Sequence, residues 1–194
     1  MHIVIYGPEG SGKGTQAKLL SEKLDLPIYT AGDLVREAAE TNKGRIGDMA
    51  RSVLLDGKYL PDGEMCNLIG EKLKDEELRK GFILDGFPRT LLQANYLMDN
   101  LSKNGYKIDK VIYLKLDEEE SVRRLIKRKR KVFGKSKILH DDPKRIRQRL
   151  KIFHQEEKSL LGFFKEKKML LEINADQTIS QVFHDIMIGL DRSL

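Results

Sequence analysis

Glycines, a lysine and a threonine near the start of the chain have the spacing of a phosphate-binding loop. The stretch GPEGSGKGT, residues 7–15, fits G-x-x-x-x-G-K-[ST] loosely, because Gly14 separates Lys13 from Thr15. An apolar run at 3–6 precedes it and a helical pattern follows. Glycines let the backbone N–H groups turn inward toward an anion, and the helix N-terminus adds its positive end. We predict that Lys13 reaches the β- and γ-phosphates of a nucleotide and that Thr15 meets Mg²⁺, directly or through water.

An acid and an arginine follow the third apolar run, in the segment DGFPR at 85–89. Asp85 would stand at the carboxyl end of a parallel strand, where ligands bind, and could hold Mg²⁺ through water. Gly86 and Pro88 impose a tight turn that would aim Arg89 across the crevice. A guanidinium grips phosphate oxygens in two places. The alternative interpretation is a structural turn with a surface ion pair.

Two further side chains are candidates for nucleotide recognition. Arg36 lies one turn into a helix whose start suits Gly32 and Asp33, although an exposed helix arginine is the alternative. Gln93 stands four residues beyond Arg89. Its carboxamide can donate and accept together, which matches the N6/N1 edge of adenine.

Positive charge is concentrated in residues 123–151, which hold fourteen Lys and Arg against two Asp, a local net charge of +12 in a chain of net charge +6. Such a segment indicates an anionic partner, either nucleotide phosphates or a nucleic acid backbone, and part of it can be a solvated helical face. Arg124 and Arg128 are four apart and share one helix face. Arg147 and Arg149 are two apart, so at most one of them should face the same site.

Strands alternating with helices must position these residues. Buried strands are predicted at 3–6, 28–29, 82–84, 111–116 and 170–173, and helices at about 14–24, 32–41, 46–56, 63–79, 90–103, 118–130, 143–165 and 178–190. Asp117 and Thr178 are the expected N-caps of two helices. The alternation predicts an α/β fold with a parallel sheet covered on both faces. Residues 30–75 and 131–142 break the rhythm, as substrate clamps and lids do.

Composition narrows the class of protein. The chain of 194 residues is 40% hydrophobic and 34% charged, which is typical of one soluble globular domain. No apolar run approaches the roughly 18 residues of a membrane span, and we see no secretory signal. Cys66, the only cysteine, excludes an intramolecular disulfide and a zinc site built from several thiolates. We expect Cys66 to be buried in a helix and the protein to be cytoplasmic.

Together these residues resemble the adenylate kinase family of nucleoside monophosphate kinases, from Ile3 to about Ile186. The resemblance rests on GPEGSGKGTQ, AGDLVR, the turn GKYLPD at 57–62, DGFPRTLLQA at 85–94, and the arginines of RLIKR and RQRL. It implies a P-loop NTPase three-layer α/β fold with a five-stranded parallel sheet. The core would span 1–29, 76–130 and 143–194, with a helical monophosphate-binding insertion at about 30–60 and a short lid at about 131–142.

The resemblance further implies reversible transfer of the γ-phosphoryl group of Mg-ATP to AMP, giving two ADP, by a monomer without a nucleic acid or membrane partner. ATP-binding roles fall on Gly10, Ser11, Gly12, Lys13, Gly14, Thr15, Arg124 and Ile179. AMP-binding roles fall on Ala31, Arg36, Lys58, Tyr59, Leu60, Gly86, Phe87, Pro88, Arg89, Gln93 and Arg149. Catalytic roles fall on Lys13, Arg89, Arg128 and Arg149, and Asp85 would hold Mg²⁺ through water.

The chain departs from the family pattern at two places. Ala31 stands where the family usually has Thr, and Thr30 is the candidate substitute for the missing hydroxyl. In the lid, Ile138 or Leu139 stands where the family usually has an arginine, and Lys137 is the nearest cation. Because lysine replaces a bidentate arginine poorly, we expect unconventional lid chemistry.

Two other functions compete with this prediction. A kinase for another monophosphate, such as UMP/CMP or GMP, would share most of these residues, although Gln93 favours adenine. A P-loop factor that binds RNA or the ribosome would account for the basic segment, and its nucleic acid binding would depend steeply on salt.

Overall fold

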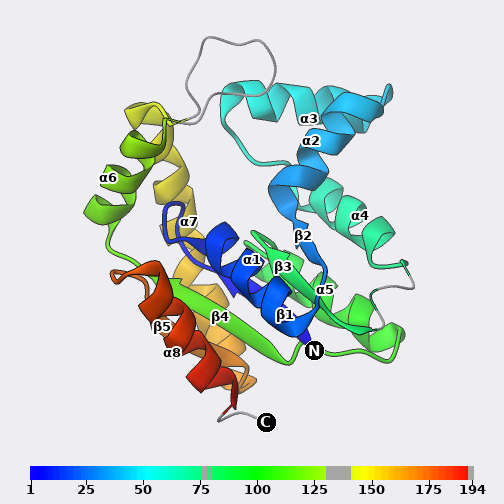
Figure 1. The fold of residues 1–194 in the computed structure, drawn as a ribbon. Coiled ribbons are helices and arrows are strands. Elements are labelled where there is room, and N and C mark those ends of the chain that lie inside the picture. The colour runs from blue at the N-terminus through cyan, green and yellow to red at the C-terminus, as the bar shows by residue number, and fades with distance from the viewer. Residues whose placement is uncertain (76–77, 79, 130–140, 192–194) are drawn as a thin grey trace.

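A five-stranded parallel sheet forms the centre of the computed structural model, which describes residues 1–75, 78, 80–129 and 141–191. The strand order is β2-β3-β1-β4-β5 (Figure 1). The strands are β1 (His2–Tyr6), β2 (Ile28–Thr30), β3 (Phe82–Asp85), β4 (Lys110–Lys115) and β5 (Leu170–Asn174). Each contains most or all of one predicted apolar run, so the predicted α/β fold with a parallel sheet is confirmed.

Helices cover both faces of this sheet. They are α1 (Lys13–Leu24), α2 (Ala31–Thr41), α3 (Arg45–Asp56), α4 (Asp62–Lys72), α5 (Leu91–Lys103), α6 (Glu118–Arg128), α7 (Pro143–Glu166) and α8 (Ile179–Asp191). Ile3 and Ile5 of β1 pack with α1 and α8, whereas Val4 and Tyr6 pack with α4, α5 and α7. Successive residues of a strand point to opposite faces, and both faces are apolar here, so β1 is buried throughout.

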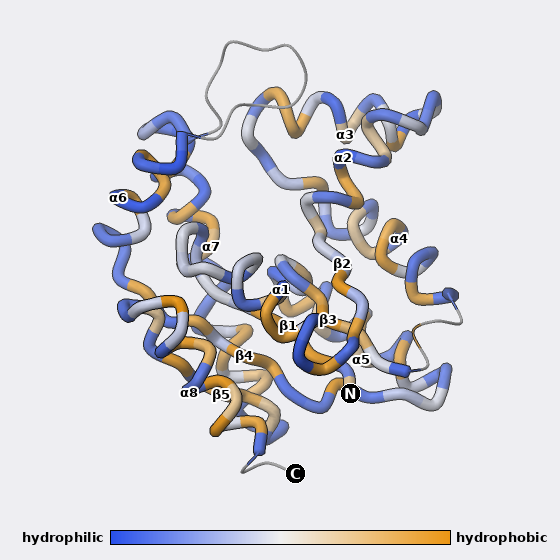
Figure 2. The backbone as a smooth tube through the Cα atoms, in the orientation of Figure 1, coloured by the Kyte–Doolittle hydropathy of each residue, from blue (hydrophilic) through white to orange (hydrophobic). Residues whose placement is uncertain are grey.

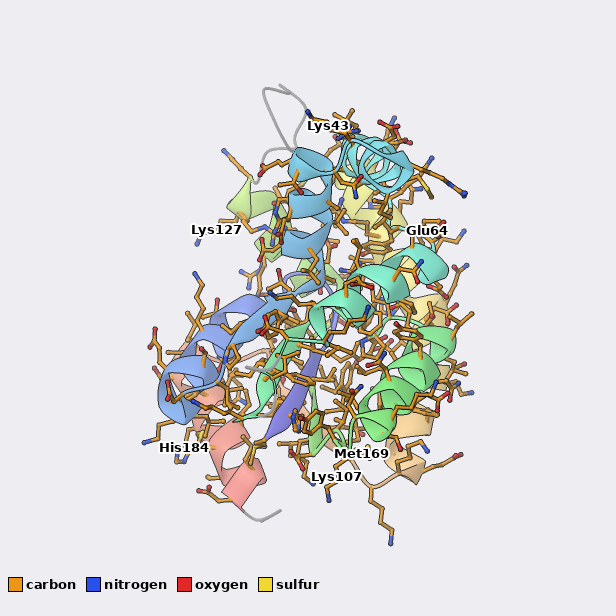
Figure 3. All side chains as sticks on the ribbon, turned by 90° about the vertical axis from the view of Figure 1, so that its right-hand side faces the viewer. Lys43, Glu64, Lys107, Lys127, Met169 and His184 are labelled. Carbon is orange, nitrogen blue, oxygen red and sulfur yellow. The ribbon has the colours of Figure 1, made fainter. Side chains whose placement is uncertain are left out.

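The hydropathy of the backbone follows these layers. Apolar residues gather along β1, β3 and β4 and on the helix turns that face them, whereas most of α6 is hydrophilic (Figure 2). Lys43, Lys107 and Lys127 are exposed at the outer surface (Figure 3). Since Lys127 belongs to the basic segment, part of that segment is a solvated helical face. Among the described residues, no helix is both long and apolar enough to cross a membrane.

Helix α4 is shorter than the sequence predicts. It ends at Lys72, whereas the helical pattern was expected to run to residue 79. After Lys72, hydrogen bonds join residues three apart, from the Asp75 N–H to the Lys72 carbonyl and from the Leu78 N–H to the Asp75 carbonyl. This tighter turn brings Leu78, which is 2% exposed, into the core. Tertiary burial of Leu78 therefore outweighs the local helical pattern.

Helix caps were predicted more accurately. The Asp117 side chain accepts a hydrogen bond from the Glu119 N–H, 2.8 Å away, at the start of α6. Before α8, Thr178 Oγ1 accepts from the Gln181 N–H while Gln181 Oε1 accepts from the Thr178 N–H, a capping box. Both predicted N-caps are confirmed, and so is the burial of Cys66 in α4, which raises the pKa of its thiol to about 11.

Two groups of helices rise beyond the carboxyl edge of the sheet, α2 and α3 on one side and α6 with the first turns of α7 on the other (Figure 1). The first group falls within the predicted insertion at 30–60. Of the predicted lid at 131–142, only Asp141 and Asp142 are described. Lys137, Ile138 and Leu139, and with them the prediction about the lid arginine, lie outside the described residues.

Candidate functional site

The glycine loop lies between β1 and α1, as predicted. Gly12 is the N-cap of α1 with φ of 92°, and Gly10 has φ of 90°. These left-handed conformations disfavour a side chain. A β-carbon on Gly10 would also lie only 3.0 Å from the Ser121 carbonyl oxygen, so α6 and the loop approach closely. The loop therefore presents backbone N–H groups at a helix N-terminus, which is a site for an anion.

Opposite charges meet at the base of this loop. Lys13 Nζ donates hydrogen bonds to the carbonyls of Gly7 and Pro8 at 2.7 and 2.8 Å. Burial lowers the pKa of Lys13, and the nearby Asp85 and Glu9 oppose that shift. Burial likewise raises the pKa of Asp85, against the effect of Lys13 and Arg89. A β-carbon on Gly14 would lie 3.6 Å from Asp85 Oδ2, so this carboxylate sits beside the loop.

Two cavities adjoin the loop. The larger, about 900 Å³, lies among the glycine loop, α1, α2 and α6, and its lining includes Gly10, Gly12, Lys13, Gly14, Thr15, Thr30, Arg36, Asp85, Arg124 and Arg128. The smaller, about 150 Å³, lies among the turn after α3, α5 and α7, and its lining includes Tyr6, Tyr59, Leu60, Asp62, Gln93, Arg149 and Phe153. Four residues line both cavities: Glu9, Lys13, Gly86 and Arg89.

Arg89 is held at the junction of the two cavities. Its Nε donates to the Gly86 carbonyl at 2.8 Å, and its guanidinium carbon lies 3.8 Å from the centroid of the Tyr59 ring. Its Nη1 is buried without a hydrogen-bond partner among the described residues. Since a buried donor normally has a partner, this nitrogen is well suited to an incoming phosphate oxygen.

Gln93 is also held in place. Its Nε2 donates to Asp62 Oδ1 at 2.7 Å, and its Oε1 accepts from the Arg89 N–H at 2.8 Å. Asp62 in turn accepts a hydrogen bond from the Thr90 hydroxyl at 2.8 Å. These hydrogen bonds fix the carboxamide at the wall of the smaller cavity. The role of Asp62 could not be predicted from the sequence, because Asp62 and Gln93 are brought together only by the packing of α4 against α5.

Arg128 and Arg149 come together through acidic partners. Arg128 makes a bidentate pair with Asp141 at 2.8 and 2.9 Å. Arg149 is only 2% exposed; its Nε donates to Glu9 Oε2 at 2.7 Å, and its Nη2 lies 3.7 Å from Asp141 Oδ1. Arg147 is exposed, so only one arginine of that pair faces the site, as expected. Sequence reasoning missed Glu9 and Asp141, because acidic residues in a glycine loop and in an Asp-Asp pair carry no spacing signal for partners so distant in the chain.

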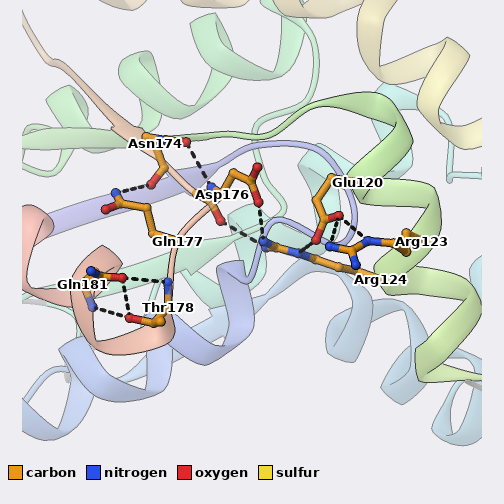
Figure 4. A network of polar contacts seen from close by, with 9 residues as sticks. Glu120, Arg123, Arg124, Asn174, Asp176, Gln177, Thr178 and Gln181 are labelled. Carbon is orange, nitrogen blue, oxygen red and sulfur yellow. Dashed lines mark hydrogen bonds and ion pairs between the residues drawn. The ribbon is translucent and has the colours of Figure 1, made fainter.

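Arg124 connects α6 to the segment after β5. Its guanidinium donates to Glu120 on its own helix, to the Ala175 carbonyl at 3.1 Å and to Asp176 at 3.3 Å (Figure 4). The same segment leads into α8, where the Ile179 carbonyl accepts a hydrogen bond from Gln16 Nε2 of α1 at 3.0 Å. Arg124 and the start of α8 thus flank the same end of the glycine loop.

Some predicted contacts lie outside the lining of both cavities. Ser11, Ala31, Phe87 and Pro88 are buried behind the lining, although a β-carbon on Gly86 would come within 3.7 Å of Ala31. Lys58 pairs with Asp56 at the surface, and Ile179 is 58% exposed. Thr30, the residue before Ala31, does line the larger cavity. Its side chain is the N-cap of α2 and is hydrogen-bonded to Asp33, which also pairs with Arg36.

Known proteins are similar to this one over nearly the whole chain, and not only at the residues of the site. Residues 5–169 match the family model described as adenylate kinase. A protein named adenylate kinase from Renibacterium salmoninarum is 36% identical over 97% of this chain and 95% of its own length. Proteins of the same name from Thermobifida fusca and Methanocella arvoryzae are 36% and 35% identical, each over 98% of this chain and 98% of their own length.

Proposed function

Because the chain belongs to the adenylate kinase family, it is an enzyme that reversibly transfers the γ-phosphoryl group of ATP to AMP, and we propose that this transfer occurs where the two cavities meet. The observation that carries the proposal is that Lys13, Gly86 and Arg89 line both cavities. Phosphoryl transfer needs the attacking and leaving oxygens nearly in line, so two nucleotides must approach each other by their phosphates. The two cations of this shared wall, Lys13 and Arg89, meet that requirement.

AMP would occupy the side formed by the smaller cavity and α2. Arg36, Arg89 and Arg149 would hold its phosphate, and the orphaned Nη1 of Arg89 supports that role. Gln93 would face the adenine, flanked by the backbone of Lys58, Tyr59 and Leu60. The Gln93 carboxamide is hydrogen-bonded to Asp62 and to the Arg89 N–H. The group that would bind the base is therefore held at a fixed position relative to Arg89, which would bind the phosphate. The segment at 30–60 is then the AMP-binding insertion.

ATP would occupy the larger cavity, with its phosphates on the backbone of residues 10–15. Arg124 and the backbone around Ile179 would flank its base. During transfer, Lys13, Arg128 and Arg149 would balance the charge that spreads over the phosphoryl oxygens. Water must also be excluded from the phosphates during transfer, since it would otherwise hydrolyse ATP. Closure of the 30–60 segment over the site would exclude water, and the lid at 131–142 stays a prediction.

The oxygen donors beside the loop fit Mg²⁺. Thr15 and Asp85 line the same cavity, and the Asp85 carboxylate lies next to Gly14. No cluster of three or more His, Cys, Asp or Glu side chains suited to a metal occurs in the described part of the chain. Mg²⁺ keeps several waters and binds through one or two carboxylates plus substrate phosphates, so a single carboxylate suffices. When bound, the ion would neutralise phosphate charge.

A coupled assay of nucleoside diphosphate formation with Mg-ATP tests the acceptor assignment. AMP, CMP, UMP and GMP are supplied in parallel at equal concentrations. We expect kcat/KM for AMP to exceed that for each other acceptor by at least about 100-fold, because a site built to hydrogen-bond one base leaves polar groups unpaired with another. Equal or faster phosphorylation of CMP or UMP would contradict the role given to Gln93.

We also propose that the enzyme is a cytoplasmic monomer without a nucleic acid partner. A single buried cysteine suits a reducing compartment. Three of the fourteen cations of the basic segment, Arg124, Arg128 and Arg149, pair with acids around the site and are therefore not free to bind a nucleic acid. Sedimentation at increasing protein concentration, with and without RNA, tests the monomeric state and the lack of a nucleic acid partner. A concentration-dependent dimer would contradict the first, and a tight RNA complex would contradict the second.

A further inference from the structure

Glu9 is an acidic side chain inside the glycine loop, at the junction of the two cavities. Both of its carboxylate oxygens are bonded to other segments of the chain. Oε2 accepts from Arg149 Nε of α7 at 2.7 Å, and Oε1 accepts from the Tyr59 hydroxyl at 3.1 Å. Tyr59 in turn stacks under the guanidinium of Arg89. One carboxylate therefore joins the phosphate loop, the turn after α3 and α7.

The charge of Glu9 is set by the cations that surround it. Burial alone would raise the pKa of this carboxyl, but Arg149, Arg89 and Lys13 together hold the pKa below its usual value. Glu9 is therefore an anion at neutral pH. The three cations around it are those assigned above to the phosphates of AMP and ATP.

A phosphate of AMP that reaches Arg149 must meet this carboxylate. A phosphate monoester carries a charge of about −1.5 to −2 at pH 7, and like charges repel strongly where water is excluded. Arg149 is 2% exposed, so the guanidinium cannot turn to solvent to serve both anions separately. Either Glu9 withdraws from Arg149 or the two anions share it at a cost in free energy.

We propose that Glu9 is an internal counter-anion that competes with the phosphate of AMP for Arg149 and thereby sets the affinity for AMP. This inference rests on the AMP-binding role proposed for Arg149. In the nucleotide-free enzyme, Glu9 keeps a buried arginine paired. When AMP binds, its phosphate replaces the Glu9 carboxylate at Arg149. Glu9 therefore weakens the binding of AMP, and it stabilises the nucleotide-free enzyme by pairing with Arg149.

The opposite role for Glu9 has a different signature. If Glu9 served to orient Arg149 for AMP, removing its charge would weaken AMP binding and slow turnover. If it were purely structural, the change would lower the stability of the protein equally with AMP and with adenosine, which lacks the phosphate. Competition alone predicts stronger binding of AMP with unchanged binding of adenosine.

The test is calorimetric titration of AMP and of adenosine into the wild-type enzyme, Glu9→Gln and Glu9→Ala at pH 8. Glutamine keeps the size of the side chain and an acceptor for the Tyr59 hydroxyl but carries no charge. We expect both variants to bind AMP at least about tenfold more tightly and adenosine within about twofold of wild type. The free variants should melt at a lower temperature, because the buried Arg149 has lost one of its two acidic partners and keeps only Asp141. AMP should raise the melting temperature of the variants more than that of wild type.

Glu156→Gln is the matched control, since Glu156 is another carboxylate in the lining of the smaller cavity and forms no ion pair with a described residue. Its ratio of AMP to adenosine affinity should stay within about twofold of wild type. An unchanged or lower ratio in the Glu9 variants overturns the proposal. Arg149→Ala separates the two hypotheses: wild-type AMP affinity in that variant would refute the proposed role of Arg149 itself.

Discussion

The acceptor side and the donor side of this site are built differently. On the acceptor side, Gln93 and Asp62 are bonded to each other, and Arg89 stacks on Tyr59, around a cavity of about 150 Å³. On the donor side, a cavity of about 900 Å³, which also reaches Arg36 of the acceptor side, is bounded by a glycine loop and by α6, where the partly exposed Arg124 pairs with Glu120 and Asp176. One side relies on fixed side chains, and the other on backbone amides and charge.

This difference teaches where selectivity should reside. Fixed, buried polar groups reject a ligand that leaves them unpaired, whereas amides and exposed cations bind any phosphate chain. The acceptor side should therefore discriminate strictly between bases, and the donor side should tolerate changes. Substitutions on the two sides should differ in size of effect and in the kinetic constant that they alter.

The largest effect is expected for Arg89, one of the four residues that line both cavities. Arg89→Ala should lower turnover by at least about 100-fold, or about 2.7 kcal/mol of transition-state stabilisation, because the cation at the junction is lost. Steady-state ADP formation with saturating AMP and Mg-ATP measures it. Arg147→Ala, an exposed arginine of the same basic segment, is the control. A loss of about tenfold or less would contradict the role of Arg89.

A smaller but selective effect is expected for Gln93. Gln93→Leu should reduce kcat/KM for AMP at least about tenfold and narrow the preference over CMP and UMP, while KM for ATP stays within about twofold. The leucine leaves the Arg89 N–H and one oxygen of Asp62 without their present partner. Parallel assays with the four acceptors check this. Equal losses for all acceptors would show that Gln93 acts through structure and not through base recognition.

On the donor side, Arg124→Ala should raise KM for ATP only about twofold to fivefold, with little change in turnover. A cation stacked on a base at a partly exposed position contributes about 0.5–1 kcal/mol. Arg123→Ala is the matched control, because Arg123 pairs with the same Glu120 but its side chain is 76% exposed. A loss in turnover as large as that of Arg89→Ala would refute the proposed difference between the two sides.

The smallest effect is expected where the donor side depends on local structure alone. Thr178→Ala removes the capping box at the start of α8 and should cost about 1 kcal/mol of unfolding free energy. In a chain of this size that lowers the melting temperature by about 2–4 °C. Thr178→Ser, which retains the hydroxyl, should melt within about 1 °C of wild type. An unchanged melting temperature for Thr178→Ala would mean that the cap does not stabilise α8.

Much of the fold could be predicted because its signals are local. Every strand coincided with an apolar run, and every helix began within about two residues of its expected start. The exception, the end of α4, was decided by burial of Leu78 in the core. The acceptor-side pairs could not be predicted in the same way, since the bond between Gln93 and Asp62 joins segments that only packing brings together.

The sequence by itself determined the glycine loop, the α/β order and the arginines and glutamine that a nucleotide kinase needs, because spacing within a few residues fixes backbone geometry and chemical type. Tertiary structure decided how these charges are paired. Glu9 and Arg149 are 140 residues apart in the chain, and no periodicity or motif relates them. Their pairing follows from the packing of α7 beside the phosphate loop, which places a carboxylate where a substrate phosphate is expected to bind.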